Sequence, residues 1–432
     1  MKFNAQLINF PNILNLLIFL IPISFIFGNL LINIEVVLIS IIGLIFYKNE
    51  LFSSKNKQIY FLIFFFLFLI ISTSIDAFIN YENSNLLKSF LFLRYLFLLL
   101  VVYLMVSKNH LNFKLFFLIC LSVTIFISID IIYQFFNYKN FLGFLKTRYH
   151  SPGIFDQEAI AGGYIQRFGI LGLFSLPIIF LKQKNKLFFL SFLVLTILIT
   201  AILFSGNRMP FILILFFCSL CFLLFKLFRI PILISLLCAV FIFIGTLNLN
   251  EGYKNNYESF FSNTSALFKN VKEELEIDIS TPKDFKSYRE KGTAFGSGHA
   301  YIWASSIEVW KQKPVIGSGI KTFRRKCISI FEFRNSVCES HPHNYYLDIL
   351  NDTGVIGLII FIVPVFFLLI NNFIYYRNHK NNIIFFALFF VLLLELFPLR
   401  SSGSFFSTSN ASFIFLTLGM LLGFDKNKEN LT

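Results

Sequence analysis

Charge is scarce in this chain of 432 residues. Asp, Glu, Lys and Arg make up 14% of the residues, apolar residues make up 56%, and the mean hydropathy is +0.74. A soluble protein of this length carries far more charge on its surface. The scarcity excludes a soluble globular fold. Uninterrupted apolar runs recur along the chain instead, and about 20 such residues are enough to cross a bilayer as a helix.

The apolar runs lack the alternation of polar and apolar residues that marks the strands of a membrane barrel. The run 61–71, for example, is apolar at every position. We therefore expect an all-α fold, a polytopic transmembrane helix bundle of about twelve spans. The expected spans cover residues 13–32, 34–48, 59–77, 88–106, 114–136, 163–181, 187–204, 210–226, 230–247, 352–371, 383–399 and 410–424.

The first apolar run lacks a small-residue cleavage site and is preceded by a single basic residue, Lys2, so we expect a retained helix rather than a signal peptide. The net charge of +14 lies mainly in short loops, where Lys and Arg set topology and contact anionic lipid rather than nucleic acid. These residues gather in every second loop, which predicts that both termini are cytoplasmic.

One long polar segment interrupts the apolar runs, between the ninth and tenth expected spans. It divides the chain into an N-terminal membrane bundle over 1–247, a loop module over 248–351 and a C-terminal membrane part over 352–432. The charge pattern places the module outside, in the periplasm if the cell is Gram-negative. Residues 251–291 read as helix and loop, with a surface helix at 271–275. Apolar side chains at helical spacing predict an amphipathic helix over 299–313, ended by Pro314.

Several motifs are absent. The run 317–322 lacks the Gly-Lys-Thr order of a phosphate loop, and no Asp-x-Asp pair stands in an outer loop, which disfavours a metal-dependent sugar-nucleotide transferase. His341 and His343 have no third zinc ligand at suitable spacing. We therefore expect no metal or other cofactor. The chain also has no internal repeat of the kind found in many transporters.

Histidine is rare, with six in the chain, yet His341 and His343 lie in one polar run directly before an apolar helix. Histidine exchanges protons near neutral pH. His343 is therefore the first catalytic candidate, with Asn344 and Tyr346 as neighbouring donors and His341 in a supporting or structural role. The alternative is a histidine that caps a helix or packs at the interface.

The predicted outer face carries few charged residues, and its arginines gather in a few turns and loops. Arg208 lies in a tight turn, Arg400 precedes a serine-rich turn, and Arg148 and Arg167 flank a longer loop. Their planar donor groups match phosphate oxygens, so several together would bind a diphosphate. The alternative for Arg208 and Arg400 is snorkelling at a helix end.

Cys327 and Cys338 are both in the predicted outer segment, where a disulfide between them is favoured over two free thiols. Asp130 and Glu395, near span ends, are weaker functional candidates, because either could simply face a water-filled cavity.

Four segments together resemble the O-antigen ligase and polymerase superfamily of bacterial envelope glycosyltransferases. Gly296 to Trp303 is similar to the family's Ser-Gly-Arg-x-x-Ile-Trp segment, and Lys313 to Gly319 looks like its Pro-x-x-Gly-x-Gly turn. His343 to Leu347, followed by Asn351 to Gly357, resembles its His-Asn-x-Tyr-Leu and Gly-x-x-Gly signature. Ser205 to Arg208 resembles its short outer turn with an arginine.

The resemblance implies metal-independent transfer of a glycan from a polyprenyl-diphosphate carrier to lipid A–core, as in lipopolysaccharide biosynthesis at the inner membrane. In that scheme His343 is the base, and Arg208, Arg400 and further arginines hold the diphosphate. The family commonly has arginine where His299 stands. His299 would therefore bind the donor when protonated, or Arg324 or Arg325 would take over.

Three alternatives remain open. A polymerase would join repeat units on the same carrier, with the same donor chemistry. The glycan could also be transferred to a serine or threonine of a protein, as a third acceptor besides lipid A–core and a repeat unit. A glycolipid flippase or transporter is the alternative from another class, although the missing repeat and the one-sided placement of polar residues favour an enzyme.

Overall fold

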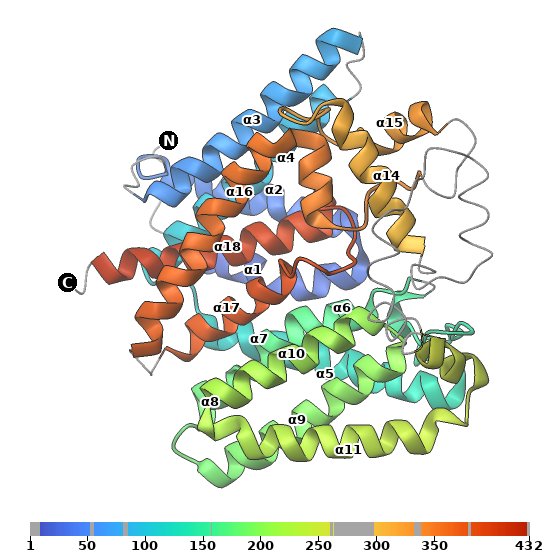
Figure 1. Cartoon of the computed structure of the whole chain (residues 1–432). Helices are drawn as coiled ribbons and strands as arrows, with labels where there is room; N and C mark the ends of the chain where they lie inside the picture. The colour runs from blue at the N-terminus through green and yellow to red at the C-terminus, as the bar shows by residue number, and fades with distance from the viewer. Residues whose placement is uncertain are drawn as a thin grey trace. The chain divides into compact units, whose positions relative to one another are not determined.

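The computed structural model describes residues 9–51, 56–80, 85–156, 158–259, 262, 298–331, 338–378 and 382–429. Within these ranges the only regular elements are helices (Figure 1). The helices are α1 (Phe10–Phe27), α2 (Asn29–Tyr47), α3 (Lys57–Asn80), α4 (Leu86–Ser107), α5 (Phe113–Asn137), η2 (Gly153–Phe155), α6 (Ala161–Tyr164), η3 (Ile165–Gly169), α7 (Ile170–Leu173), α8 (Ser175–Phe180), α9 (Lys184–Ser205), α10 (Arg208–Leu224), η4 (Lys226–Phe228), α11 (Arg229–Leu247), α14 (Gly298–Gln312), α15 (Phe323–Ile330), α16 (Tyr345–Asn378), α17 (Ile383–Glu395) and α18 (Thr408–Glu429).

The chain is an all-α, multi-pass membrane protein. Within the described ranges, nine helices or helix runs are long and apolar enough to cross a membrane, and α10, α17 and most of α18 form shorter apolar helices. A helix satisfies its backbone hydrogen bonds internally, which is why apolar segments adopt this form in lipid. Each predicted span overlaps one of these helices or runs.

Several predicted boundaries were wrong because local signals outweighed hydropathy. The first span was expected to run to residue 32, but α1 ends at Phe27, and Gly28 turns the chain with φ +98°. The tenth was expected to begin at residue 352; α16 begins at Tyr345, directly after the His341 to Asn344 segment, but its backbone breaks at Gly354 with φ +64°, two residues after the expected start. The amphipathic helix before Pro314 is confirmed as α14. The expected surface helix at 271–275 lies outside the described residues.

The chain forms two compact units. Unit 1 contains residues 1–39, 105–260 and 375–395, and unit 2 contains residues 40–104, 261–374 and 396–432. In unit 1, α9 packs against α5 and α11. Three aromatic rings contact one another in the interior: Phe174 between α7 and α8, Phe217 of α10 and Phe390 of α17. The three predicted domains follow a different division and stay a prediction.

The interior of unit 2 is also aromatic. Phe66 of α3, Phe92 of α4 and Phe415 of α18 contact one another through their rings. Phe405, in the loop before α18, contacts Phe361 of α16 and the first residue of that helix, Tyr345. This packing fixes the 396–407 loop against the start of α16, which is where the predicted histidine site lies.

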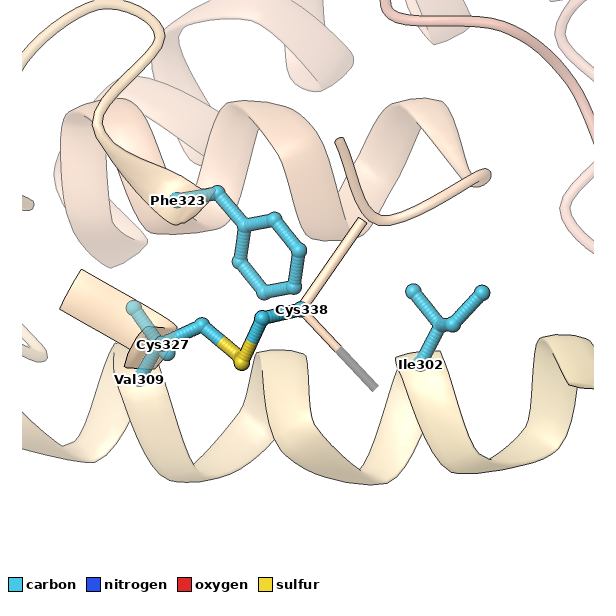
Figure 2. Close-up of a cluster of buried hydrophobic side chains, with 5 residues drawn as sticks. All are labelled: Ile302, Val309, Phe323, Cys327 and Cys338. Atoms are coloured by element: carbon cyan, nitrogen blue, oxygen red, sulfur yellow. A yellow bond between two sulfur atoms is a disulfide. The ribbon is translucent and has the colours of Figure 1, made fainter. Parts of the chain in front are cut away.

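A smaller apolar cluster joins α14 and α15. Ile302 and Val309 of α14 are buried against Phe323 and Cys327 of α15, together with Cys338 (Figure 2). The predicted disulfide between Cys327 and Cys338 is confirmed, with the two Cα atoms 5.5 Å apart. It covalently joins α15 to the segment that carries His341 and His343.

Candidate functional site

The segment before α16 and the loop before α18 are held together by two hydrogen bonds in unit 2, one between backbones and one from a side chain. The Ser402 N–H donates to the His343 carbonyl over 2.9 Å. The Asn344 side-chain amide donates to the Pro398 carbonyl over 2.7 Å. Arg400 lies between these two contacts along the loop and is 8% exposed. Two predicted site residues far apart in the sequence, His343 and Arg400, are therefore brought into one pair of loops.

Asn344 begins α16. Its side-chain oxygen accepts hydrogen bonds from the backbone N–H groups of Tyr346 and Leu347, at 3.0 and 3.2 Å. Such a contact stabilises a helix start by satisfying donors that have no partner within the helix. Tyr346 donates its hydroxyl to the Leu396 carbonyl. Both side chains, predicted to bind substrate, are thus seen fastening the helix start to the 396–407 loop.

His343 adopts an uncommon backbone conformation. Its φ is +55°, in the left-handed region that residues other than glycine rarely occupy and that clusters at functional sites. Its ring lies 4.2 Å from the ring of His341, centroid to centroid. The backbone on both sides of this conformation is tied to the 396–407 loop, by the Ser402 N–H on the His343 carbonyl and by the Asn344 side chain on the Pro398 carbonyl.

The pKa of His343 is lowered from its ordinary value. Burial is the main cause, because desolvation penalises the charged ring, while Glu339 and a hydrogen bond with the Ser402 backbone act in the opposite direction. With a lowered pKa the ring is mainly neutral at pH 7, so one of its nitrogens carries a lone pair, which is the state that a general base requires.

Two carboxylates, Asp348 and Asp352, lie in the first turns of α16, just after the His343 segment. The Asp348 carboxylate accepts from the Ser404 hydroxyl at 2.7 Å and from the Phe405 N–H at 2.8 Å. The Asp352 carboxylate accepts from the Lys321 N–H at 2.7 Å. Both residues are almost fully buried. They fix the loops that carry Arg400 and Lys321 to the same helix as Tyr346.

Unit 1 contains a second group of predicted site residues, around the turn from α9 to α10. Gly206 ends α9 with φ +74°, and α10 begins at Arg208. A side chain at position 206 would collide with the Tyr149 carbonyl and the His150 ring. The glycine therefore allows the 149–150 segment to lie directly on the turn, which brings His150 close to Arg208.

His150 has a defined orientation in this group. Its Nδ1 lies 3.2 Å from the Ser205 carbonyl oxygen, which can only accept, so Nδ1 is the donor. Burial and the positive charge of Arg208 lower the pKa of His150. Arg208 is half-buried and also interacts electrostatically with Tyr257. The exposed Arg148 guanidinium lies over the Tyr149 ring at 5.4 Å.

Arg167 lies apart from that turn, in the π-helical turn η3. Its Nε donates to a Glu395 oxygen over 2.8 Å, and NH2 donates to the other oxygen of the same carboxylate. The Glu395 side chain is fully buried and that of Arg167 is 10% exposed. This is a two-point ion pair, so the charge of Arg167 is balanced within the protein. Asp130 instead receives hydrogen bonds from Asn140 and Phe141 of the loop after α5.

The remaining predicted residues have plain outcomes. His299 belongs to α14, but its side chain lies outside the described residues. The ranges that the structure describes contain no group of three His, Cys, Asp or Glu side chains placed to hold a metal ion. Sequence reasoning did not assign a role to Ser402, Asp348 or His150. Only His150 had a signal, as a histidine two residues after Arg148.

Residues 191–362 match the profile of a family described as O-antigen ligase. The matched segment runs from α9 to the first half of α16 and therefore includes Arg208, His299 and His343. The predicted resemblance is confirmed over this segment. No curated protein matches the chain.

Proposed function

We propose that this multi-pass membrane protein, which carries an O-antigen ligase family domain over residues 191–362, transfers an assembled glycan from a polyprenyl-diphosphate carrier to a sugar of lipid A–core. The reaction would take place at the periplasmic face of the inner membrane. The observation that carries the proposal is that His343 and Arg400 lie in one pair of loops, which the Ser402 N–H joins by donating to the His343 carbonyl.

The proposed step is a single displacement. The acceptor hydroxyl attacks the anomeric carbon of the donor while His343 takes the hydroxyl proton. The bond from that carbon to the diphosphate oxygen breaks, and the polyprenyl diphosphate leaves with the electron pair. One displacement inverts the anomeric configuration. No nucleotide, metal or other cofactor enters this scheme.

Arginine would stabilise the leaving group, because negative charge grows on the diphosphate as the bond breaks. We assign this role to Arg400, which shares the loop pair with His343. Arg208, Arg148 and His299 stay predictions for contacts to the donor. Arg167 is paired with Glu395 and stays a weaker prediction for the same role. Asn344, Tyr346 and His341 position the loop that carries the base.

A lipopolysaccharide profile tests the proposal. A deletion strain would be complemented with wild type, His343→Ala, or His110→Ala as a matched control from the loop before α5. Wild type and the control should restore long chains on lipid A–core. His343→Ala at normal protein levels should leave core without long chains and full-length glycan on the carrier.

Other outcomes would contradict this proposal in distinguishable ways. Survival of core bearing one repeat unit in the deletion strain would indicate a polymerase. An unchanged profile in that strain would remove both activities and favour a transporter. Full activity of His343→Ala would remove the assigned base while leaving the family relationship intact.

A further inference from the structure

Residues 138–146 follow α5 and form a short hairpin, which we call the 138–146 hairpin. Lys139 and Leu145 form an antiparallel bridge, and the Lys146 N–H donates to the Tyr138 carbonyl over 2.9 Å. Gly143 turns the chain with φ +90°. The large side chains at the tip are apolar and remain 37–67% exposed: Phe141, Leu142, Phe144 and Leu145. An exposed apolar cluster of this kind marks a surface that contacts something other than water.

The tip of the hairpin lies alongside α5 rather than beyond its end. The Phe141 ring lies 4.7 Å from the Tyr133 ring and 6.3 Å from the Phe126 ring, measured between centroids. At 1.5 Å per residue, Tyr133 lies about 6 Å and Phe126 about 16 Å before the last residue of α5, Asn137. The 25 residues of α5 span about 37 Å, and the hydrocarbon core of a bilayer is about 30 Å thick. The level that Phe141 occupies along α5 is therefore inside the hydrocarbon region.

The backbone of the tip makes its hydrogen bonds within the protein. Five consecutive N–H groups, those of residues 140–144, donate to protein acceptors over 2.8–3.0 Å. The acceptors are the Asp130 carboxylate, the Asn140 side-chain oxygen and two carbonyls of the hairpin. The Gln134 amide donates to the Phe144 carbonyl over 3.1 Å. A loop in water can leave such groups to the solvent, whereas irregular backbone at membrane depth requires partners from the protein.

Two polar residues of α5, Asp130 and Gln134, hold the hairpin against the helix. Both are fully buried. A carboxylate at this depth in a span is costly unless it has partners. The Asp130 carboxylate accepts from the Phe141 N–H and, over 3.3 Å, from the Asn140 amide. The polar side chains of the span therefore satisfy the hairpin, and the hairpin satisfies them.

Lysine and tyrosine side chains lie at the base of the hairpin. Lys146 Nζ donates to the Phe135 carbonyl over 2.9 Å and lies 3.8 Å from the centre of the Tyr138 ring. Tyr138 and Lys139 are exposed. Both residue types are common where hydrocarbon meets the lipid headgroups, because each joins an apolar body to a polar end. The base of the hairpin therefore suits that boundary, and the tip suits a deeper level.

We propose that the 138–146 hairpin is immersed in the bilayer leaflet in which α5 ends, with its tip against lipid acyl chains. Lipid is favoured over a protein partner because the tip continues the outward surface of a membrane span. On α5 that surface is formed by exposed side chains at the same level, Phe126, Ile129 and Tyr133. The inference does not rest on the proposed transferase activity.

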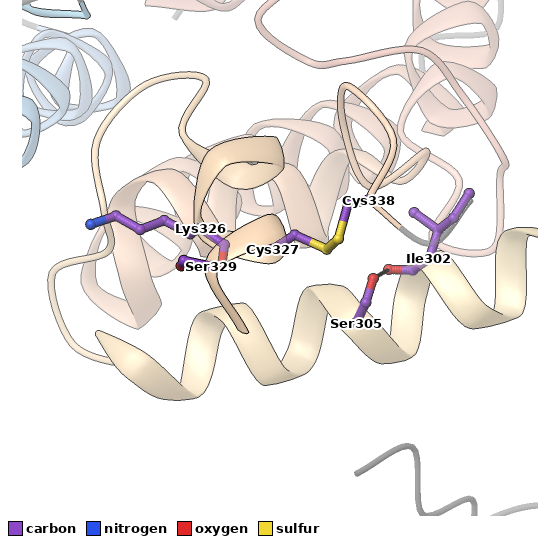
Figure 3. Close-up of a disulfide and its surroundings, with 6 residues drawn as sticks. All are labelled: Ile302, Ser305, Lys326, Cys327, Ser329 and Cys338. Carbon is purple, nitrogen blue, oxygen red and sulfur yellow. Dashed lines mark hydrogen bonds between the residues drawn. A yellow bond between two sulfur atoms is a disulfide. The ribbon is translucent and has the colours of Figure 1, made fainter. Parts of the chain in front are cut away.

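Spin labels read by electron paramagnetic resonance test the proposal on the full chain in nanodiscs. The background replaces the four free cysteines by alanine and keeps the disulfide between Cys327 and Cys338 (Figure 3). A nitroxide is attached at Leu142→Cys and, in separate samples, at Leu237→Cys and Glu258→Cys. Leu237 is 71% exposed on the membrane-spanning α11 and is the lipid control. The Glu258 side chain, 62% exposed in the polar segment after α11, is the water control.

The measurement compares collisions of the label with oxygen, which concentrates in lipid, and with a neutral nickel chelate, which stays in water. At position 142 we expect oxygen to relax the label more than the chelate does, as at position 237, with the reverse order at position 258. Thermal unfolding of the labelled variants should match that of the unlabelled background, because the replaced side chains are exposed. Leu145→Cys, at the same tip, repeats the measurement if the label at 142 destabilises the protein.

Two outcomes would overturn the proposal. A label at the tip that collides mainly with the chelate would place the tip in water. A label that collides with neither reagent would mean that another protein or a second copy of the chain covers the tip.

Discussion

At the scale of single residues, the two histidines with shifted pKa values share one environment. His343 and His150 are both partly buried, and burial lowers their pKa values. His150 also donates Nδ1 to the Ser205 carbonyl. A ring whose pKa is lowered in this way is mainly neutral at pH 7, and one of its nitrogens carries a lone pair. Position alone does not make either of them a base, but this protonation state is the one that a base needs.

The pH dependence of glycan transfer follows from that state. A base acts when deprotonated, and the pKa of His343 lies below 6.5. We expect the transfer rate to change little above pH 7 and to fall as the pH is lowered through the pKa of His343, which lies below its ordinary value, as the ring becomes charged. Initial rates with purified protein over this pH range measure the effect, with His110→Ala as the control. A rate that still rises with pH above neutrality would contradict the role of His343.

The buried ion pair gives a prediction about stability. Glu395→Gln leaves the buried guanidinium of Arg167 without its counter-charge, which should cost about 3–5 kcal/mol of unfolding free energy. The control Glu258→Gln breaks an exposed pair with Lys254 and should cost less than about 1 kcal/mol. Denaturant unfolding in detergent measures both. Equal costs would show that the Arg167 pair is not the buried interaction described here.

At the scale of elements, several loops of unit 2 are fastened by hydrogen bonds to the first turns of α16. Its start is capped by Asn344, and Asp348 and Asp352 hold loops against its first turns. The glycine turn after α14 approaches the same helix, where the Ser318 N–H donates to the Asn351 carbonyl and the Gly319 N–H to the Asp352 carbonyl. These contacts require close approach of two backbones.

Gly317→Ala tests that approach. The new Cβ would lie 2.5 Å from backbone atoms of Asp352, Thr353 and Gly354, at a position with φ +72°. We expect a loss of more than about 1 kcal/mol in unfolding free energy. Gly245→Ala in α11, where nothing lies within 4 Å, should be neutral or stabilising by about 0.5–1 kcal/mol. Thermal unfolding of both variants decides; a tolerated Gly317→Ala would contradict the close packing.

At the scale of the whole molecule, the charge pattern predicts which side of the membrane each loop faces. Lys184 lies in a loop predicted to be cytoplasmic, and Lys254 lies in the segment predicted to be periplasmic. In a variant without the free cysteines, Lys254→Cys should react with a membrane-impermeant thiol reagent in intact spheroplasts, and Lys184→Cys only after lysis.

Labelling in the reverse order would place the His343 segment on the cytoplasmic side. In the proposed reaction the polyprenyl-linked glycan is used on the periplasmic face. A cytoplasmic His343 segment would therefore contradict the transferase proposal. Reaction of both cysteines before lysis would mean leaky spheroplasts and would be recognised by the reaction of a cytoplasmic marker enzyme.

The sequence alone determined the all-α membrane class, the approximate position of each span, the α14 helix before Pro314 and the pairing of Cys327 with Cys338. Each follows from information within about 20 neighbouring residues, such as hydropathy, periodicity and proline placement, or from the choice of the two cysteines in one polar segment. The end of α1 was missed because a single glycine, not hydropathy, sets it.

Only the tertiary structure decided which polar residues meet. Arg167 pairs with Glu395 across 228 positions, and Lys313 with Asp76 across 237. Ser402 holds His343 through a backbone hydrogen bond, which the identity of neither residue predicts. A buried charge or backbone group needs a partner, but many partners of the right chemistry exist along the chain, and the packing of the helices selects among them.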